Sequence, residues 1–199
     1  MQTPRRYHHG DLRAALLAGA EDTLREKGPA ALSLRELARD LGVSHAAPSR
    51  HFKDKQALLD ALALVGFDRI SRTMTTALEE AGESFADRLA AGARSYVDFA
   101  VANAELLDLM YSIKHTPEAS EELGAASQRW TEQMMNLIVE GQRSGEVREG
   151  PLERVGIGVF STLHGYATLA ASDSLPEEMR GQDLDELVAY ILRGCAPGA

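Results

Sequence analysis

Apolar residues recur every three or four positions along almost the whole chain, which is the period of an amphipathic α-helix. No convincing run of alternating β-branched and polar residues indicates a strand. Glycines, prolines and short polar residues that cap helices divide the pattern into segments. We therefore expect an all-α protein of about nine helices.

The first four expected helices lie at about 11–27, 33–41, 44–52 and 54–82. The expected N-caps of the second, third and fourth helices are Ser33, Ser44 and Asp54. The glycines expected to close the first, second and fourth helices are Gly28, Gly42 and Gly82. Five more helices are expected at about 84–103, 105–114, 118–143, 152–172 and 183–194. No linker rich in Pro, Gly or Ser separates two parts, so we place the boundary inside the fourth helix. This gives a head at 7–71 and a body at 72–199.

The charge of the chain is divided unevenly along its length. The formal net charge is −9, yet residues 1–56 hold ten Lys/Arg against seven Asp/Glu and four of the six His. The remaining residues hold 11 basic against 23 acidic side chains, a balance of −12. This asymmetry predicts a head that attracts anions, joined to an acidic body.

The head contains two short helical segments joined by a tight turn at Gly42, within residues 33–52. That spacing is typical of a helix-turn-helix motif, although an ordinary helical hairpin with a solvated polar face would show it too. The second segment carries short polar and basic side chains, which reach phosphates and base edges without blocking entry to the major groove.

The same stretch resembles the DNA-binding domain of the TetR family of transcriptional regulators. The matching sequence segments are Leu34-Arg35-Glu36-Leu37-Ala38, Leu41-Gly42-Val43-Ser44 and Arg50-His51-Phe52-Lys53-Asp54-Lys55, followed by Leu58-Leu59. The opening Tyr7-His8-His9-Gly10-Asp11 is similar to one branch of the family. The resemblance implies a homodimer with one recognition helix per subunit and a ligand-binding C-terminal body. One departure is Ser49, where relatives commonly carry an aromatic residue that touches the DNA backbone, so the operator affinity of this chain is open.

The residues expected to contact DNA combine hydroxyl donors, basic side chains and two alanines that suit a thymine methyl. They are Ser33, Arg35, Ser44, His45, Ala46, Ala47, Ser49, Arg50, His51 and Lys55. Arg5, Arg6, His8 and His9 form a basic arm that either reaches the DNA or is a disordered terminus.

The body carries recurring aromatic and methionine residues, which suit either core packing or an apolar ligand pocket with a few polar groups. The candidate pocket residues are Tyr96, Phe99, Met110, Tyr111, Trp130, Met134 and His164. The acidic body disfavours anionic ligands at long range and so favours neutral or cationic ones, although one buried Arg or His would reverse this locally.

The segment at 152–172 is rich in Gly and Ala, which allows two helices to approach closely, either across a two-fold axis or inside the core. Its piece Phe160-Ser161-Thr162-Leu163-His164-Gly165 resembles the dimerisation helix of a TetR subgroup. The candidate interface residues are Phe160, His164, Gly165, Ala167, Leu187 and Ile191.

Other classes of protein find little support. There is no G-x-S-x-G, phosphate loop or H-E-x-x-H, so we expect no enzyme, catalytic residue, cofactor or bound metal. The single cysteine, Cys195, excludes an internal disulfide framework. With no apolar run of membrane-spanning length and no secretory signal, we expect a cytoplasmic protein.

We interpret the chain as a DNA-binding regulator, most simply a ligand-responsive repressor that binds a palindromic operator. The alternative is a helical adaptor for other proteins that has lost specific DNA binding.

Overall fold

The computed structural model describes residues 12–175 and 183–198. Every regular element in this part of the chain is helical: eight α-helices and two single 3₁₀ turns. The α-helices are α1 (Leu12–Lys27), α2 (Leu34–Asp40), α3 (Lys55–Glu80), α4 (Phe85–Ala102), α5 (Ala104–Ile113), α6 (Glu121–Arg143), α7 (Leu152–Ala171) and α8 (Asp183–Cys195). The all-α class is confirmed, and the boundaries lie within a few residues of those expected.

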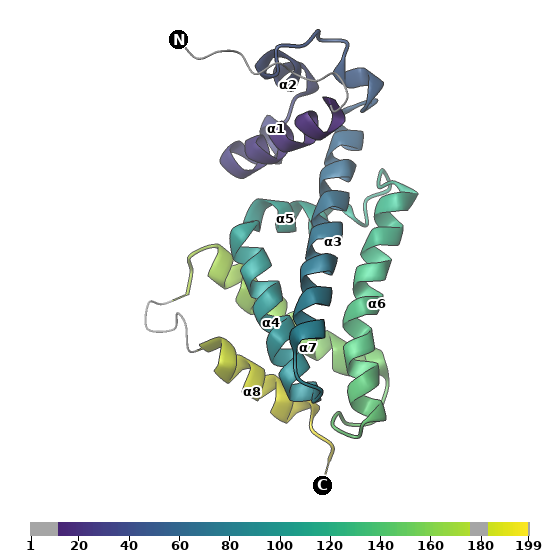
Figure 1. The fold of residues 1–199 in the computed structure, drawn as a ribbon, viewed down its shortest axis with the longest axis vertical. Helices are drawn as coiled ribbons and strands as arrows, with labels where there is room; N and C mark the ends of the chain where they lie inside the picture. The colour runs from purple at the N-terminus through teal and green to yellow at the C-terminus, as the bar shows by residue number, and fades with distance from the viewer. Residues whose placement is uncertain (1–11, 176–182, 199) are drawn as a thin grey trace.

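The head consists of α1, α2 and a 3₁₀ turn at Pro48–Arg50, stacked on the first turns of α3 (Figure 1). The expected cap of α2 is present, because the Ser33 hydroxyl accepts a hydrogen bond from the Glu36 backbone N–H at 3.4 Å. Gly42 has φ +67°, the left-handed conformation that lets the chain turn sharply after α2. The buried side chains of the head are Leu16, Ala20, Leu24, Leu37, Ala38, Phe52 and Leu58.

The segment expected to form a third α-helix at 44–52 differs from the prediction. Only Pro48–Arg50 is helical there, as a 3₁₀ turn, preceded by hydrogen-bonded turns at 45–46. Pro48 has no N–H to bond to the Ser44 carbonyl, so the hydrogen bond that would start an α-helix is missing. The carbonyls of Ser44 and Ala47 instead accept from residues three positions ahead, which is the tighter 3₁₀ pattern.

Helix α3 joins the head to the body. The Asp54 carboxylate caps it by accepting from the Ala57 backbone N–H at 2.9 Å. Its 26 residues span about 39 Å at the ordinary helical rise. The helix therefore runs from the head deep into the body (Figure 1), and the predicted domain boundary after residue 71 falls inside it.

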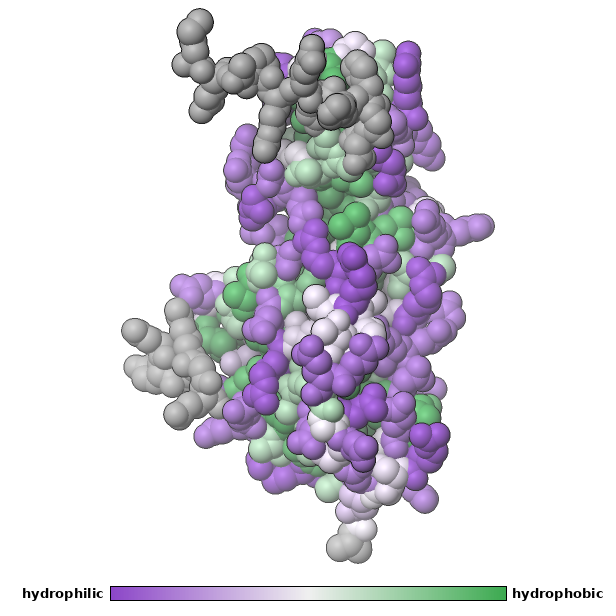
Figure 2. Space-filling model, viewed as in Figure 1, coloured by the Kyte–Doolittle hydropathy of each residue, from purple (hydrophilic) through white to green (hydrophobic). Residues whose placement is uncertain are grey.

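The body is built around α4 and α7, which pack against each other, with α3 and α6 alongside and α8 on the outer side of α4 and α7 (Figure 1). Helix α5 lies against α1, α3 and α4, at the junction of head and body. In the view of Figure 2 most of the surface is hydrophilic, with smaller hydrophobic patches. Among the described residues, no helix is long and apolar enough to cross a membrane.

Candidate nucleic-acid interface and candidate ligand sites

The end of the head opposite the body presents the segment between α2 and α3. Pro48 and Phe52 are buried and fix this segment to the head core. Most side chains before Pro48, and those between Pro48 and Phe52, point outward. The exposed residues are Ser44, His45, Ala46, Ser49, Arg50 and His51, and Ala47 is half-buried. Six of the ten predicted DNA-contacting residues thus share one accessible surface.

Three further predicted residues lie beside this segment. Ser33 is committed to capping α2, and Arg35 in the first turn of the same helix is exposed. The Lys55 ammonium donates to the Ala30 carbonyl at 2.9 Å, which ties the start of α3 to the turn after α1. An ammonium has three donors, so Lys55 keeps two for a phosphate. The basic arm of Arg5, Arg6, His8 and His9 lies outside the described residues.

Head and body are linked by a polar cluster centred on Arg69 of α3. Its guanidinium donates from both terminal nitrogens to the Glu21 carboxylate of α1, at 2.7 and 3.0 Å. The same group donates to the Asn103 side-chain oxygen at 2.8 Å, and the Asn103 amide donates in turn to the Phe99 carbonyl at 2.9 Å. The hydrogen bond from Arg69 lowers the pKa of Glu21, so this carboxylate is charged at neutral pH. These four residues form what we call the Arg69 clamp.

The body holds an aromatic cluster that includes four of the seven predicted pocket residues. The Tyr96 hydroxyl lies 2.7 Å from His164 Nδ1, and the Trp130 indole N–H donates to the Tyr111 hydroxyl at 3.2 Å. Tyr96 stacks on Trp130, and Tyr111 lies 4.8 Å from the His164 ring between centroids. Phe160 contacts three of these rings. The cluster connects α4, α5, α6 and α7.

Burial sets the protonation of this cluster. It raises the pKa of Tyr96 and of Tyr111, so both remain phenols at neutral pH. Burial and the nearby Lys114 charge lower the pKa of His164, which is therefore neutral. A neutral imidazole with its proton on Nε2 accepts the Tyr96 O–H at Nδ1. The Tyr96 hydroxyl, His164 Nδ1, the Trp130 indole N–H and the Tyr111 hydroxyl are thus each hydrogen-bonded within the cluster.

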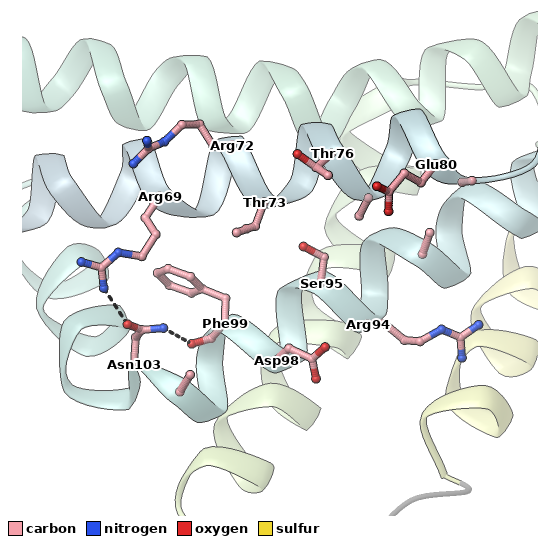
Figure 3. Close-up of a pocket in the computed structure, with 14 residues that line it drawn as sticks. Arg69, Arg72, Thr73, Thr76, Glu80, Arg94, Ser95, Asp98, Phe99 and Asn103 are labelled. Atoms are coloured by element: carbon pink, nitrogen blue, oxygen red, sulfur yellow. Dashed lines mark hydrogen bonds between the residues drawn. The ribbon is translucent and has the colours of Figure 1, made fainter.

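The remaining predicted pocket residues have different surroundings. Met134 lines a largely apolar internal cavity of about 40 Å³, next to Tyr96 and Phe160. Met110 is fully buried where α5 meets α3, so close to Gly66 that a Cβ there would collide with its sulfur. Phe99 lies outside the ring cluster and lines an open groove between α3 and α4 (Figure 3).

The predicted dimer residues fall on two faces of α7 and α8. Gly165 is exposed and Leu187 is half-buried, whereas Phe160 and His164 turn toward the ring cluster. Ala167 and Ile191 are buried within the protomer and lie beneath its surface, and Ile191 also lines an open groove beside Tyr190. The outward face carries large apolar side chains that the helical periodicity did not single out: Ile157, Leu169 and Tyr190, which are 61%, 48% and 63% exposed.

These features define the class: a helix-turn-helix head on a long connecting helix, carried by a separate helical body. Comparison with protein families agrees with it. Residues 16–62 match the model described as "Bacterial regulatory proteins, tetR family", and residues 89–195 match "Tetracyclin repressor-like, C-terminal domain". The chain belongs to the TetR family and is a DNA-binding transcriptional regulator. Regulators of this family are generally not enzymes.

Similar solved structures cover nearly the whole chain. A Rhodococcus sp. RHA1 protein of unknown function is 45% identical, with a TM-score of 0.85, over 96% of this chain and 99% of that one. A tetR-family regulatory protein from Rhodococcus RHA1 is 21% identical, with a TM-score of 0.71, over 94% and 97% of the two chains. The regulator PfmR from Thermus thermophilus is 23% identical, with a TM-score of 0.67, over 89% and 97%. The last two show the shared fold. No curated protein matches the chain.

Proposed function

We propose that this regulator is a cytoplasmic repressor that binds a palindromic operator as a homodimer and releases it when a small molecule binds the body. The observation that carries the proposal is the exposed segment 44–51, anchored at the head end of α3 by the buried Pro48 and Phe52, while the other end of α3 is part of the body core. A movement of the body is therefore passed to the DNA-contacting surface through one helix.

Operator binding uses the two heads of a dimer together. Two recognition segments related by a two-fold axis read half-sites about one helical turn apart. A ligand that favours a different spacing of the heads lowers the affinity for the operator, because binding energy is lost at one half-site. The basic head meets the DNA, and the acidic body is turned away from it.

The aromatic cluster is one candidate for the effector site. The cavity beside it, at about 40 Å³, is far below the roughly 300–1,000 Å³ of ordinary ligand pockets. An effector there requires Met134 and its neighbours to move. Trp130 is buried inside the cluster and would report such a movement by a change in fluorescence.

Selection of bound DNA from a random duplex pool tests the proposal. We expect the full chain to enrich a palindrome, and the same palindrome to bind one dimer in a sedimentation experiment. Failure to enrich any palindrome at low salt would contradict operator binding, and it would favour the adaptor interpretation instead.

A further inference from the structure

The junction between α4 and α5 consists of a single residue, Asn103. It follows Ala102, the last residue of α4, and precedes Ala104, the first residue of α5. Asn103 is therefore the N-cap of α5, a position where an asparagine side chain ordinarily accepts a hydrogen bond from a backbone N–H of the first turn. Here α5 has no side-chain cap. The side-chain oxygen of Asn103 accepts instead from the Arg69 guanidinium at 2.8 Å (Figure 3).

The N-caps of other helices show what α5 lacks. In α2, α3, α4 and α6 the side chain of the N-cap accepts from the backbone N–H three positions ahead, and the backbone of the cap is extended. These caps are Ser33, Asp54, Ser84 and Ser120. Asn103 has φ −140° and ψ 45°, whereas Ser33 has φ −145° and ψ 121°. A rotation about ψ therefore separates Asn103 from a capping residue, and the N–H it would then accept from belongs to Leu106.

The Arg69 clamp holds Asn103 in its present position. The Asn103 amide donates to the Phe99 carbonyl at 2.9 Å, which directs the side-chain oxygen toward Arg69 (Figure 3). Arg69 also donates to the Glu21 carboxylate of α1, at 2.7 and 3.0 Å. The junction of α4 and α5 is thus bonded, through one arginine of α3, to the head. If the Asn103 oxygen turned toward Leu106, Arg69 would keep Glu21 as its remaining partner in the clamp.

The aromatic cluster reaches the same junction from both sides. Tyr96 lies on α4 before Asn103, and Tyr111 lies on α5 after it. Both rings contact Phe160 and His164 of α7. A ligand that separates the two tyrosine rings changes the angle between α4 and α5. Because Asn103 alone joins these helices, its backbone takes up the change.

We propose that Asn103 is a two-position switch between body and head, an inference that rests on the proposed function and describes how the operator is released. In the present position its oxygen holds Arg69 and fixes the orientation of the head. In the second position it caps α5 through the Leu106 N–H and frees the head from the junction. One hydrogen bond replaces another, so the two positions are close in free energy and a small movement of the cluster selects between them. Asn103 is thus a positioning residue for operator binding, and it acts through Arg69.

Two substitutions of Asn103 distinguish a switch from a simple support. Asn103→Ser and Asn103→Ala both lose the bond to Arg69, because the serine oxygen lies one bond nearer the backbone. Only serine is able to cap α5. We expect the Leu106 amide to exchange its hydrogen at least tenfold more slowly in Asn103→Ser than in Asn103→Ala, as measured by NMR on the full chain.

The orientation of the head is measured by the distance between two nitroxide labels. Glu26→Cys on α1 and Glu132→Cys on α6 place the labels at exposed positions, in a Cys195→Ala background. The labelled chain is diluted with unlabelled chain, so only distances within one chain are recorded. We expect one narrow distance in the reference protein, a second narrow distance in Asn103→Ser and a broad distribution in Asn103→Ala. The control Arg94→Gln changes an arginine of the same groove that pairs within the body with α8, and it should keep the reference distance.

The inference is overturned if both substitutions of Asn103 keep the reference distance. It is also overturned if Asn103→Ser and Asn103→Ala give the same broad distribution and the same exchange rate, because Asn103 would then only support the fold. On the selected operator, Asn103→Ser should bind at least fivefold more weakly than the wild type, and Arg94→Gln should bind equally well. The distances require no DNA, effector or dimer. A failed operator search would therefore contradict the proposed function, while the distances still decide on the switch.

Discussion

Arg50 is the predicted DNA-contacting side chain that is easiest to test. It is exposed at the end of the 3₁₀ turn, and no described residue forms an ion pair with it. We expect Arg50→Ala to weaken binding to operator and random DNA alike, and to reduce the salt dependence of binding by about one charge, because a phosphate contact carries no sequence information. Fluorescence anisotropy at several salt concentrations measures both effects.

The matched control for Arg50 is Arg143→Ala, which removes the same charge from the body. Its DNA affinity and salt slope should equal those of the wild type. Equal losses in both variants would mean that net charge alone, and no local contact at residue 50, governs the affinity. Lys55 is a poorer choice, since its bond to the Ala30 carbonyl makes any loss partly structural.

The Glu21–Arg69 pair predicts a dependence of stability on pH. The pKa of Glu21 is lowered in the folded protein from an ordinary value of 4.5, with its hydrogen bond to Arg69 as the largest cause. The stabilisation is therefore fully present above the unfolded pKa and is lost as the pH falls through the lower, folded value. The difference in unfolding free energy between wild type and Glu21→Gln should be largest at pH 6–7 and shrink below about pH 4.5.

Urea denaturation at several pH values measures this difference. The control Glu132→Gln removes an exposed acid of α6, and it should show a smaller effect at neutral pH. A difference for Glu21→Gln that stays constant between pH 7 and pH 3 would show that the ion pair does not stabilise the fold.

Individual residues could be predicted from the sequence only where the local pattern was informative. Tyr96, Tyr111, Trp130 and His164 were identified because large rings recur at helical spacing, and the structure brings them together. The Arg69 clamp was missed. Glu21 and Asn103 lie 48 and 34 positions from Arg69, and a charged residue on a helix is ordinarily a solvated one. Only the tertiary packing of α1, α3 and α4 reveals the contact.

At the scale of the elements, the capping residues were the strongest local signal. Ser33, Asp54 and the left-handed Gly42 all have the predicted roles. The failure at 44–52 has a local cause too. Because proline is tolerated in the first turn of a helix, Pro48 did not argue against an α-helix when the segment was interpreted from the sequence. The segment is so short that the missing bond at Pro48 leaves no further turns to sustain one.

The cap of α3 gives a prediction for a whole element. Asp54→Ala removes the acceptor of the Ala57 N–H and should destabilise the protein by about 1 kcal/mol. For a chain of this size that lowers Tm by roughly 2–4 °C. Ser33→Ala should cost less, since its bond to Glu36 is long at 3.4 Å. Differential scanning calorimetry measures the change in Tm, and Ser49→Ala, at an exposed position with no cap to lose, is the control. An Asp54→Ala protein as stable as the control would contradict the role of the cap.

In the whole molecule, the connecting helix explains how one chain combines two tasks. α3 forms part of the head core through Leu58 and part of the body core through Phe67, Ile70 and Met74. The sequence showed no linker between its basic and acidic parts, and one continuous helix across the boundary explains this. The orientation of head on body depends on side chains such as Arg69, whose partners are far apart in the sequence, and so it was beyond prediction.

The last prediction concerns assembly. Ile157, Gly165 and Leu169 are all exposed along α7, and exposed Tyr190 adds to the apolar surface from α8. Large apolar side chains left exposed together mark an interaction surface. A second copy of the chain suits it, because the small side chain at Gly165 permits the close approach of two identical helices.

Gly165→Leu tests this surface without harming the protomer. A Cβ at Gly165 meets no atom within 4 Å in the protomer, and replacing a mid-helix glycine favours the helix itself. The variant should therefore fold with an equal or higher Tm and sediment as a monomer, with operator affinity lowered at least tenfold because one half-site is lost. Val139→Glu alters an exposed apolar residue of α6 and should remain a dimer. A Gly165→Leu protein that stays dimeric would place the interface elsewhere, and a wild type that is monomeric at micromolar concentration would exclude the dimer altogether.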